Sequence, residues 1–122
     1  MDKTYADQRL FKPNKYHARK VTFQGETFDS KHELDCWLRL RAEEQAGRIR
    51  GLRRQVRFEL IPAQRTPCGD LFRKCEYVCD FVYERDGRTC AEDAKSPATR
   101  TPAYIIKRKL MLRVHGIYVE EV

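Results

Sequence analysis

Polar and apolar residues alternate along residues 74–95, and a chain reversal stands in the middle of that stretch. Side chains of a β-strand repeat every two residues, so alternate positions face one side of a sheet. The positions that share a side are Val78, Asp80 and Val82 before the reversal, and Ala91, Asp93 and Lys95 after it. Asp86–Gly87 at the reversal is typical of a two-residue hairpin turn. The pattern therefore predicts two antiparallel strands.

Two other stretches have the spacing of amphipathic helices. The first is predicted over residues 30–46, with Ser30 before its first turn and Gly47 after its last. The second is predicted over residues 102–115, with proline at its first position. The residues at helical spacing in the first helix are Leu34, Trp37, Leu38 and Arg41. In the second helix they are Ala103, Ile106, Leu110 and Val114, which we predict to form its buried stripe.

Shorter patterns complete the chain. They predict a small hairpin at residues 20–28, a strand at 55–61 that Pro62 ends, a loop at 63–72 and a last strand at 117–122.

The predicted order is therefore helix, three strands, helix, strand. Short links let the three strands form an antiparallel meander, and the second helix permits a right-handed crossover to a parallel fourth strand. We expect an α/β (α+β) fold, a mixed sheet flanked by helices, in a single domain over residues 20–122. A basic N-terminal arm, residues 1–19, precedes it.

The net charge of +7 is concentrated in clusters. Residues 46–57 hold five arginines and no acid, and residues 96–119 hold five cations and no acid. Such clustering favours a polyanion such as DNA as partner, although ordinary solvated faces can also carry these charges. The candidate DNA-binding residues are Lys15, Arg19, Lys20, Arg50, Arg53, Arg54, Arg57, Lys107 and Arg108.

Membrane and secretory segments are not evident in the sequence. No apolar run approaches the roughly 20 residues that span a bilayer, and residues 1–16 lack an apolar stretch of the signal-peptide kind. We expect a cytoplasmic protein with no membrane partner, in which a disulfide framework is not expected from the five cysteines.

Cysteine spacing also argues against structural zinc. Cys68, Cys75 and Cys79 form no CxxC pair, and the three histidines lie far off in the sequence. Cys75 and Cys79 fall on the side of their strand opposite Asp80, where we expect them to pack as small apolar residues.

The predicted strand pair carries the candidate chemistry. Asp80 and Asp93 are separated as two residues must be if they meet across a hairpin, and Lys95 shares a side with Asp93. Two carboxylates suit Mg²⁺, and the carbonyl of Ala94 adds a further candidate ligand. Lys95 is expected to orient an attacking water or stabilise developing negative charge, although a cross-strand salt bridge is its plainer interpretation. Glu92 is the rival of Asp93, but alternation places it on the opposite face.

Glu33 has two interpretations that local sequence leaves open. Ser30 and Glu33 have the spacing of a capping box, in which the Glu33 carboxylate reaches back to the Ser30 amide. The alternative is that Glu33 faces the strand pair as a third acid.

Glu33, Asp80 and Asp93-Ala94-Lys95, in this order on helix and strands, resemble the PD-(D/E)xK nuclease superfamily. The strings KYHARKVTFQGETFDSKHELD, YVCDFVY and AEDAKS look like a family of small phage-encoded endonucleases. The resemblance covers residues 15–122 and implies a restriction-endonuclease-like core. It also implies that Glu33 is an active-site acid, that Asp80 and Asp93 bind Mg²⁺ or Mn²⁺, and that Lys95 is the catalytic lysine.

The expected function is hydrolysis of DNA phosphodiester bonds. A small basic member without a further base-reading domain looks most like a structure-selective endonuclease such as a Holliday junction resolvase, for which paired cuts imply a homodimer. The alternative is a non-catalytic DNA-binding or recombination-accessory protein that kept the fold. Similar sequences carry Gln-Pro where this chain has Gln55–Val56, so no role near the site is assigned to Gln55.

Overall fold

The computed structural model describes residues 19–122, and the predicted basic arm lies outside this range except for Arg19. The chain forms two compact units, Met1–Asp35 and Cys36–Val122, each described here by itself. The first unit contains a hairpin of β1 (Val21–Phe23) and β2 (Glu26–Phe28). Gln24 and Gly25 in its turn have φ angles of 50° and 81°, the left-handed pair that a type I′ turn requires. The predicted hairpin is confirmed.

Helix α2 (Lys31–Gln45) begins and ends where the sequence predicts. The Ser30 Oγ accepts a hydrogen bond of 3.1 Å from the Glu33 amide, so Ser30 caps the N-terminus. At the other end Gly47 has a φ of 78°, and its amide donates to the Glu44 carbonyl over 3.0 Å. The Arg48 amide donates to the Glu43 carbonyl, also over 3.0 Å, which completes a Schellman motif.

A four-stranded mixed sheet forms the centre of the second unit, in the order β3-β6-β7-β8. The strands are β3 (Arg50–Ile61), β6 (Cys75–Arg85), β7 (Arg88–Asp93) and β8 (Val119–Glu121). The first three run antiparallel to their neighbours and β8 runs parallel to β7, as the sequence predicts. With its two helices the chain is a mixed α+β protein.

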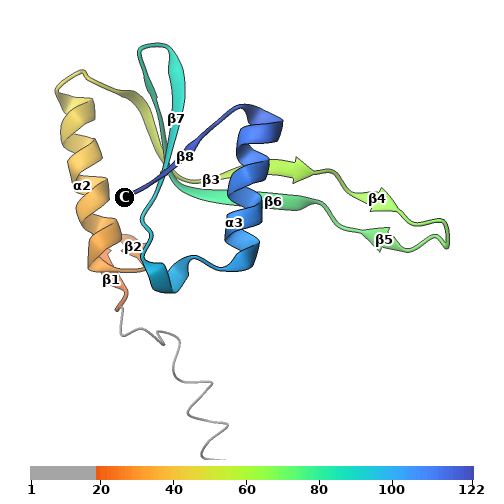
Figure 1. The fold of residues 1–122 in the computed structure, drawn as a ribbon. Coiled ribbons are helices and arrows are strands. Elements are labelled where there is room, and N and C mark those ends of the chain that lie inside the picture. The colour runs from red at the N-terminus through yellow and green to blue at the C-terminus, as the bar shows by residue number, and fades with distance from the viewer. Residues whose placement is uncertain (1–18) are drawn as a thin grey trace, which may run out of the picture. The chain divides into compact units, whose positions relative to one another are not determined.

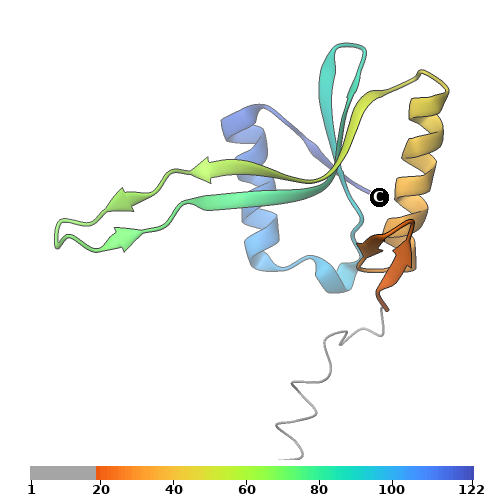
Figure 2. The same ribbon diagram turned by 180° about the vertical axis from the view of Figure 1, so that it is seen from behind.

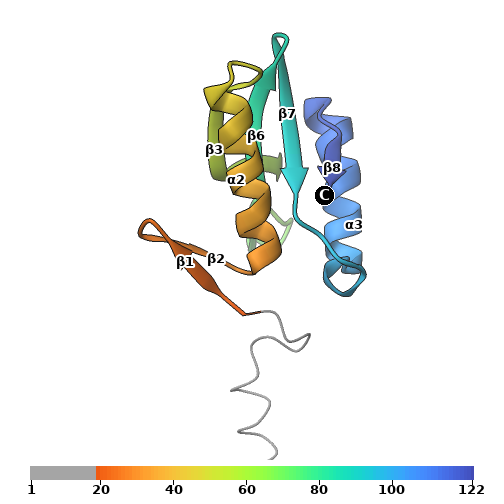
Figure 3. The same cartoon turned by 90° about the vertical axis from the view of Figure 1, so that its left-hand side faces the viewer.

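Within the second unit, α3 lies against one face of this sheet, and the part of α2 from Cys36 onward lies against the other (Figure 3). Trp37 of α2 stacks on Phe81 with ring centroids 6.2 Å apart. On the other face a buried cluster joins α3 to the sheet; its members are Leu60, Tyr77, Cys79, Val82, Ala91, Tyr104, Met111 and Val119. Cys79 and Val82 both belong to that cluster, so the alternation of β6 shifts by one residue between them. Asp80 lies at the shift.

Strands β3 and β6 extend well beyond β7 and β8 as a two-stranded ribbon (Figures 1 and 2). Its end consists of β4 (Gln64–Arg65) paired with β5 (Leu71–Phe72). The expectation of a loop at 63–72 is therefore wrong, as is the start of the preceding strand at residue 55, because pairing with β6 reaches back to Arg50. Strand β3 ends before Pro62, and β4 and β5 continue the ribbon. The Thr66 amide donates to the Asp70 carbonyl over 2.8 Å, and this hydrogen bond closes the turn between β4 and β5.

Helix α3 (Pro102–Leu110) begins as predicted, with the Thr101 Oγ1 accepting from the Tyr104 amide over 3.1 Å. One π-helical turn, Met111–His115, continues it to Gly116.

The predicted buried stripe of α3 is wrong. Ile106 and Val114 are 59% and 48% exposed, whereas Tyr104 and Met111 are buried. Arg108 lies between these two on the buried face, because its Nε donates to the Val119 carbonyl over 2.8 Å. A charged residue thus occupies a position that hydropathy assigns to solvent.

No helix within residues 19–122 is long and apolar enough to cross a bilayer.

Candidate functional site

Asp80 and Asp93 lie side by side where β6 and β7 separate. Phe81 and Glu92 form the last paired positions of the two strands, and the two aspartates come next. The Asp80 amide donates to Asp93 Oδ1 over 2.8 Å, and the Ala94 amide donates to Asp80 Oδ2 over 3.0 Å. Each carboxylate thus holds the backbone of the opposite strand, and the structure brings together the two acids and Ala94.

Asp93 is almost completely buried, with 2% of its surface exposed. The Tyr77 hydroxyl donates to its Oδ2. Burial raises the pKa of the Asp93 carboxyl, while the hydrogen bond from the Asp80 amide and the charge of Lys95 oppose this rise. A second cation beside Asp93 would therefore stabilise its ionised form.

Asp80 is only half-buried and accepts a further hydrogen bond from a residue that the sequence left without a role. The Gln55 Nε2 donates to Asp80 Oδ1 over 3.0 Å. Gln55 has a φ of 54°, a left-handed conformation that a glutamine rarely adopts. It lies between Arg54 and Val56, which pair with Phe81 and Cys79, so it stands opposite Asp80 in the ladder.

Lys95 follows β7 and stays attached to the sheet edge, because its amide donates to the Val122 carbonyl over 3.1 Å. Its Nζ lies 4.3 Å from the centre of the Tyr104 ring, on the face that holds Asp93. The Tyr104 hydroxyl donates to Glu121 Oε2 over 2.8 Å. This bond and the Arg100 guanidinium lower the pKa of the Glu121 carboxyl. Sequence reasoning missed Tyr77, Tyr104 and Glu121, for which no short motif exists.

Glu92 points away from this group, as alternation predicts. Its Oε1 accepts from Arg39 of α2 over 2.7 Å, and its Oε2 accepts from the Tyr83 hydroxyl. Its charge is therefore balanced on the α2 face. The neighbouring Cys79 is fully buried, and desolvation raises the pKa of its thiol to about 12. Cys79 packs in the cluster beneath α3 and Cys75 packs against it, as predicted.

Glu33 belongs to the first unit and is 3% exposed. Its Oε1 accepts from the Asp29 amide over 2.8 Å, one residue before the Ser30 amide that a capping box would use. Its role as a third active-site acid stays a prediction. Within residues 19–122 no three His, Cys, Asp or Glu side chains gather as a metal-binding group.

A known protein family matches almost the whole chain. A family described as a protein of unknown function, DUF1064, matches residues 13–120. The chain belongs to the DUF1064 family. Comparisons with curated proteins and with solved structures gave no match.

The candidate DNA-binding residues of this DUF1064 member lie in different settings. Arg50 and Arg53 are exposed on β3, and Arg57 is exposed with its NH1 3.2 Å from Glu76 Oε1. Arg54 lies over the Trp37 ring at 5.8 Å, and Arg108 is bound to the Val119 carbonyl. Of the others, Lys107 is half-buried, Arg19 and Lys20 are exposed in the first unit, and Lys15 lies outside the described residues.

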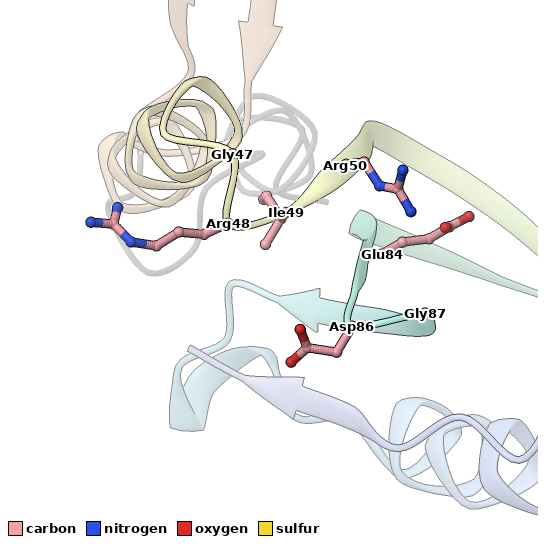
Figure 4. A pocket seen from close by; sticks show the side chains of 7 residues that line it. All are labelled: Gly47, Arg48, Ile49, Arg50, Glu84, Asp86 and Gly87. Atoms are coloured by element: carbon pink, nitrogen blue, oxygen red, sulfur yellow. The ribbon is translucent and has the colours of Figure 1, made fainter.

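A polar pocket lies at the far end of the β6–β7 hairpin of the DUF1064 fold (Figure 4). Arg50 and Glu84, paired across β3 and β6, line it with Asp86 of the turn. Both signs of charge meet in it, and none of the predicted catalytic residues lines it. The candidate chemistry therefore lies at the separation of β6 and β7 and not in this pocket.

Proposed function

We propose that the protein is a divalent-metal-dependent DNA endonuclease. The observation that carries the proposal is the contact of Asp80 and Asp93 where β6 and β7 separate, with Lys95 on the face of Asp93. The order helix, three strands, helix, strand supports a restriction-endonuclease-like core, in which these residues would have the roles that the resemblance implies.

The donor set fits a hard divalent cation. Asp80 and Asp93 offer carboxylate oxygens, the ligand type that such an ion prefers. Mg²⁺ usually takes one or two carboxylates and completes its shell with waters and substrate phosphates. We assign Asp80, Asp93 and the Ala94 carbonyl to Mg²⁺ or Mn²⁺, and Glu33 as a further acid. When bound, the ion supplies charge stabilisation at the phosphate.

Lys95 is the residue that we assign to the attacking water. Its ammonium rests on the Tyr104 ring, and an aromatic face attracts a cation without removing its protons. Lys95 therefore keeps three donors with which it can orient a water and stabilise developing negative charge.

The substrate is assigned by charge. Arg50, Arg53 and Arg57 lie exposed along β3, the strand that also carries Gln55, the partner of Asp80. Arginines on phosphates position a duplex without reading its sequence, which favours a structure-selective enzyme acting on branched DNA such as a Holliday junction. Symmetric cuts at a junction would require a homodimer.

Cleavage of labelled branched and linear DNA in Mg²⁺ tests the proposal. We expect cleavage by the wild type, and losses of at least ~100-fold with Asp93→Asn and Lys95→Ala, as removal of charge-stabilising groups produces. Lys109→Ala, at an exposed position of α3, is the control and should cleave normally. Unchanged cleavage by both site variants, or no cleavage of any substrate, would contradict the assignment.

A non-catalytic DNA-binding protein is the second candidate. It is favoured by the hydrogen bonds of the two carboxylates, which join β6 to β7 and so give both acids a structural role. Such a protein would bind the same DNA and leave it intact in Mg²⁺ and Mn²⁺.

A further inference from the structure

The most exposed part of the second unit is the end of the β3–β6 ribbon. We call residues 61–75 the arm; it contains β4, β5 and the turn between them (Figures 1 and 2). Every residue of the arm is exposed except Thr66 and Cys75, which are half-buried. The body of the unit ends just before it, because Leu60 and Tyr77 are the last ribbon residues in the buried cluster.

Large apolar side chains project from the arm into solvent. Ile61, Leu71 and Phe72 are 39%, 50% and 60% exposed. Leu71 and Phe72 are adjacent in β5, so they face opposite sides of the ribbon. A two-stranded hairpin that buries neither face is only marginally stable by itself in water. A partner that covers these apolar side chains would therefore stabilise the arm.

The charge of the arm indicates which kind of partner fits it. The arm carries three cations, Arg65, Arg73 and Lys74, and one acid, Asp70. The whole of β3, the arm and β6, residues 50–85, carries eight cations and five acids, a net charge of +3. A second copy of this chain, itself at +7, is a poor electrostatic complement, whereas a polyanion attracts both ribbon and arm.

We propose that the arm lies in the major groove of duplex DNA, with Phe72 against the bases and Arg73 and Lys74 on the phosphates. The major groove of B-DNA, ~12 Å wide, admits a two-stranded ribbon, whereas the deep, narrow major groove of duplex RNA does not. An apolar side chain at the floor of the major groove can contact base edges, above all the methyl group of thymine. This inference rests on the proposed function for DNA as partner.

The ribbon also connects the arm to the candidate site. Asp80 and Phe72 lie eight positions apart along the same segment, β5 to β6. At ~3.3 Å per residue this is about 26 Å, or roughly eight base pairs of ~3.4 Å. DNA bound by the arm at Phe72 would therefore be contacted within about 26 Å of the phosphate at Asp80.

Fluorescence anisotropy with a labelled DNA duplex in EDTA tests the arm separately from cleavage. We expect Phe72→Ala to weaken binding roughly 10-fold, as the loss of one buried phenylalanine contact produces. Ile106→Ala is the control, because Ile106 is 59% exposed and lies on α3, outside the arm. It should bind within about two-fold of the wild type, and a matched RNA duplex should bind more weakly than DNA.

The outcomes separate this inference from the proposed function. Arm-dependent binding without cleavage in Mg²⁺ would leave the inference standing and contradict the nuclease. Cleavage with equal DNA binding by Phe72→Ala and wild type would overturn the inference alone. Conversion of a dimer to a monomer by Phe72→Ala, with DNA affinity unchanged, would show that the arm binds a second copy and would also overturn it. Thermal unfolding should be unchanged in both variants, because both side chains are exposed.

Discussion

The backbone amide of Asp80 donates a hydrogen bond to the carboxylate of Asp93 over 2.8 Å, at the place where their strands part. The Asp80 carboxylate in turn accepts from the amide after Asp93, that of Ala94. Side chains thus replace the ladder hydrogen bonds that the separating strands give up. The same exchange holds two carboxylates together near Lys95, so one arrangement serves both the fold and the proposed chemistry.

Asp80→Asn and Asp93→Asn should separate these two uses. Asparagine keeps a carbonyl oxygen that accepts the amide hydrogen bond, so we expect the thermal unfolding temperature to change by only a few degrees. Loss of the negative charge removes the proposed ligand, and cleavage should fall by at least ~100-fold. Asp86→Asn, in an exposed turn where asparagine tolerates a φ of 53°, is the control. Large destabilisation with parallel loss of activity would point to a purely structural pair.

The stability of the metal-free protein should depend on pH through Asp93. Burial raises the pKa of this carboxyl on folding, so the folded chain holds the proton to higher pH than the unfolded chain. Its contribution to the free energy of unfolding is therefore lost as the pH rises from its ordinary pKa of 3.8 through the folded value. Asn cannot titrate, so the stability of Asp93→Asn relative to the wild type should rise across this window and then level off. Denaturant unfolding in EDTA at a series of pH values measures it, and a constant difference would contradict the buried charge.

Divalent cations should stabilise the wild type more than the aspartate variants. A ligand that binds only the folded state adds about 2.7 kcal/mol at 100 times its Kd. We expect Mg²⁺ and Mn²⁺ to raise the unfolding temperature of the wild type, and to have little effect on Asp80→Asn. Thermal unfolding over a range of ion concentrations checks this, with K⁺ at equal ionic strength as control. An equal rise in both proteins would place the ion elsewhere.

Local chemistry predicted those features of the chain that depend on neighbouring residues. The turns at Gln24–Gly25 and Asp86–Gly87 both have left-handed backbones, and Ser30 and Gly47 bound their helix. The contact between Asp80 and Asp93 followed from hairpin register. Strand period alone was wrong here, because it placed Cys79 and Val82 on opposite sides and both lie in the cluster beneath α3.

Features set by packing across the sheet could not be predicted in this way. The left-handed φ of Gln55 is stabilised by a partner 25 residues away, Asp80. The buried face of α3 includes Arg108 because the Val119 carbonyl, at the edge of the sheet, accepts a hydrogen bond from its Nε. The arm escaped prediction because Pro62 and Gly69 are typical of a loop, and only the pairing of β4 with β5 makes it a ribbon.

Gln55 should support cleavage through its side chain. Gln55→Ala removes the 3.0 Å hydrogen bond to Asp80, so the carboxylate is held less firmly, and cleavage should fall about 10-fold, a loss near the ~1.4 kcal/mol typical of one such bond. Gln55→Gly removes the same bond but relieves the left-handed backbone, which costs a residue with a Cβ roughly 1–2 kcal/mol. We therefore expect equal activity and higher stability for Gly than for Ala. Restored activity in Gln55→Gly would show that the backbone, and not the amide group, is what matters.

Substitution of Glu33 can distinguish a role in capping α2 from a role in catalysis. Its Oε1 accepts from the Asp29 amide over 2.8 Å, and glutamine retains an oxygen that can accept the same bond. If Glu33 is an active-site acid, Glu33→Gln should unfold at the wild-type temperature and lose most cleavage, while Glu33→Ala should also lose roughly 1 kcal/mol of stability with the cap. Asp35→Asn, on the exposed face of the same helical turn, is the control. Wild-type cleavage by Glu33→Gln would assign this glutamate to the helix cap alone, and the site would then consist of Asp80, Asp93 and Lys95.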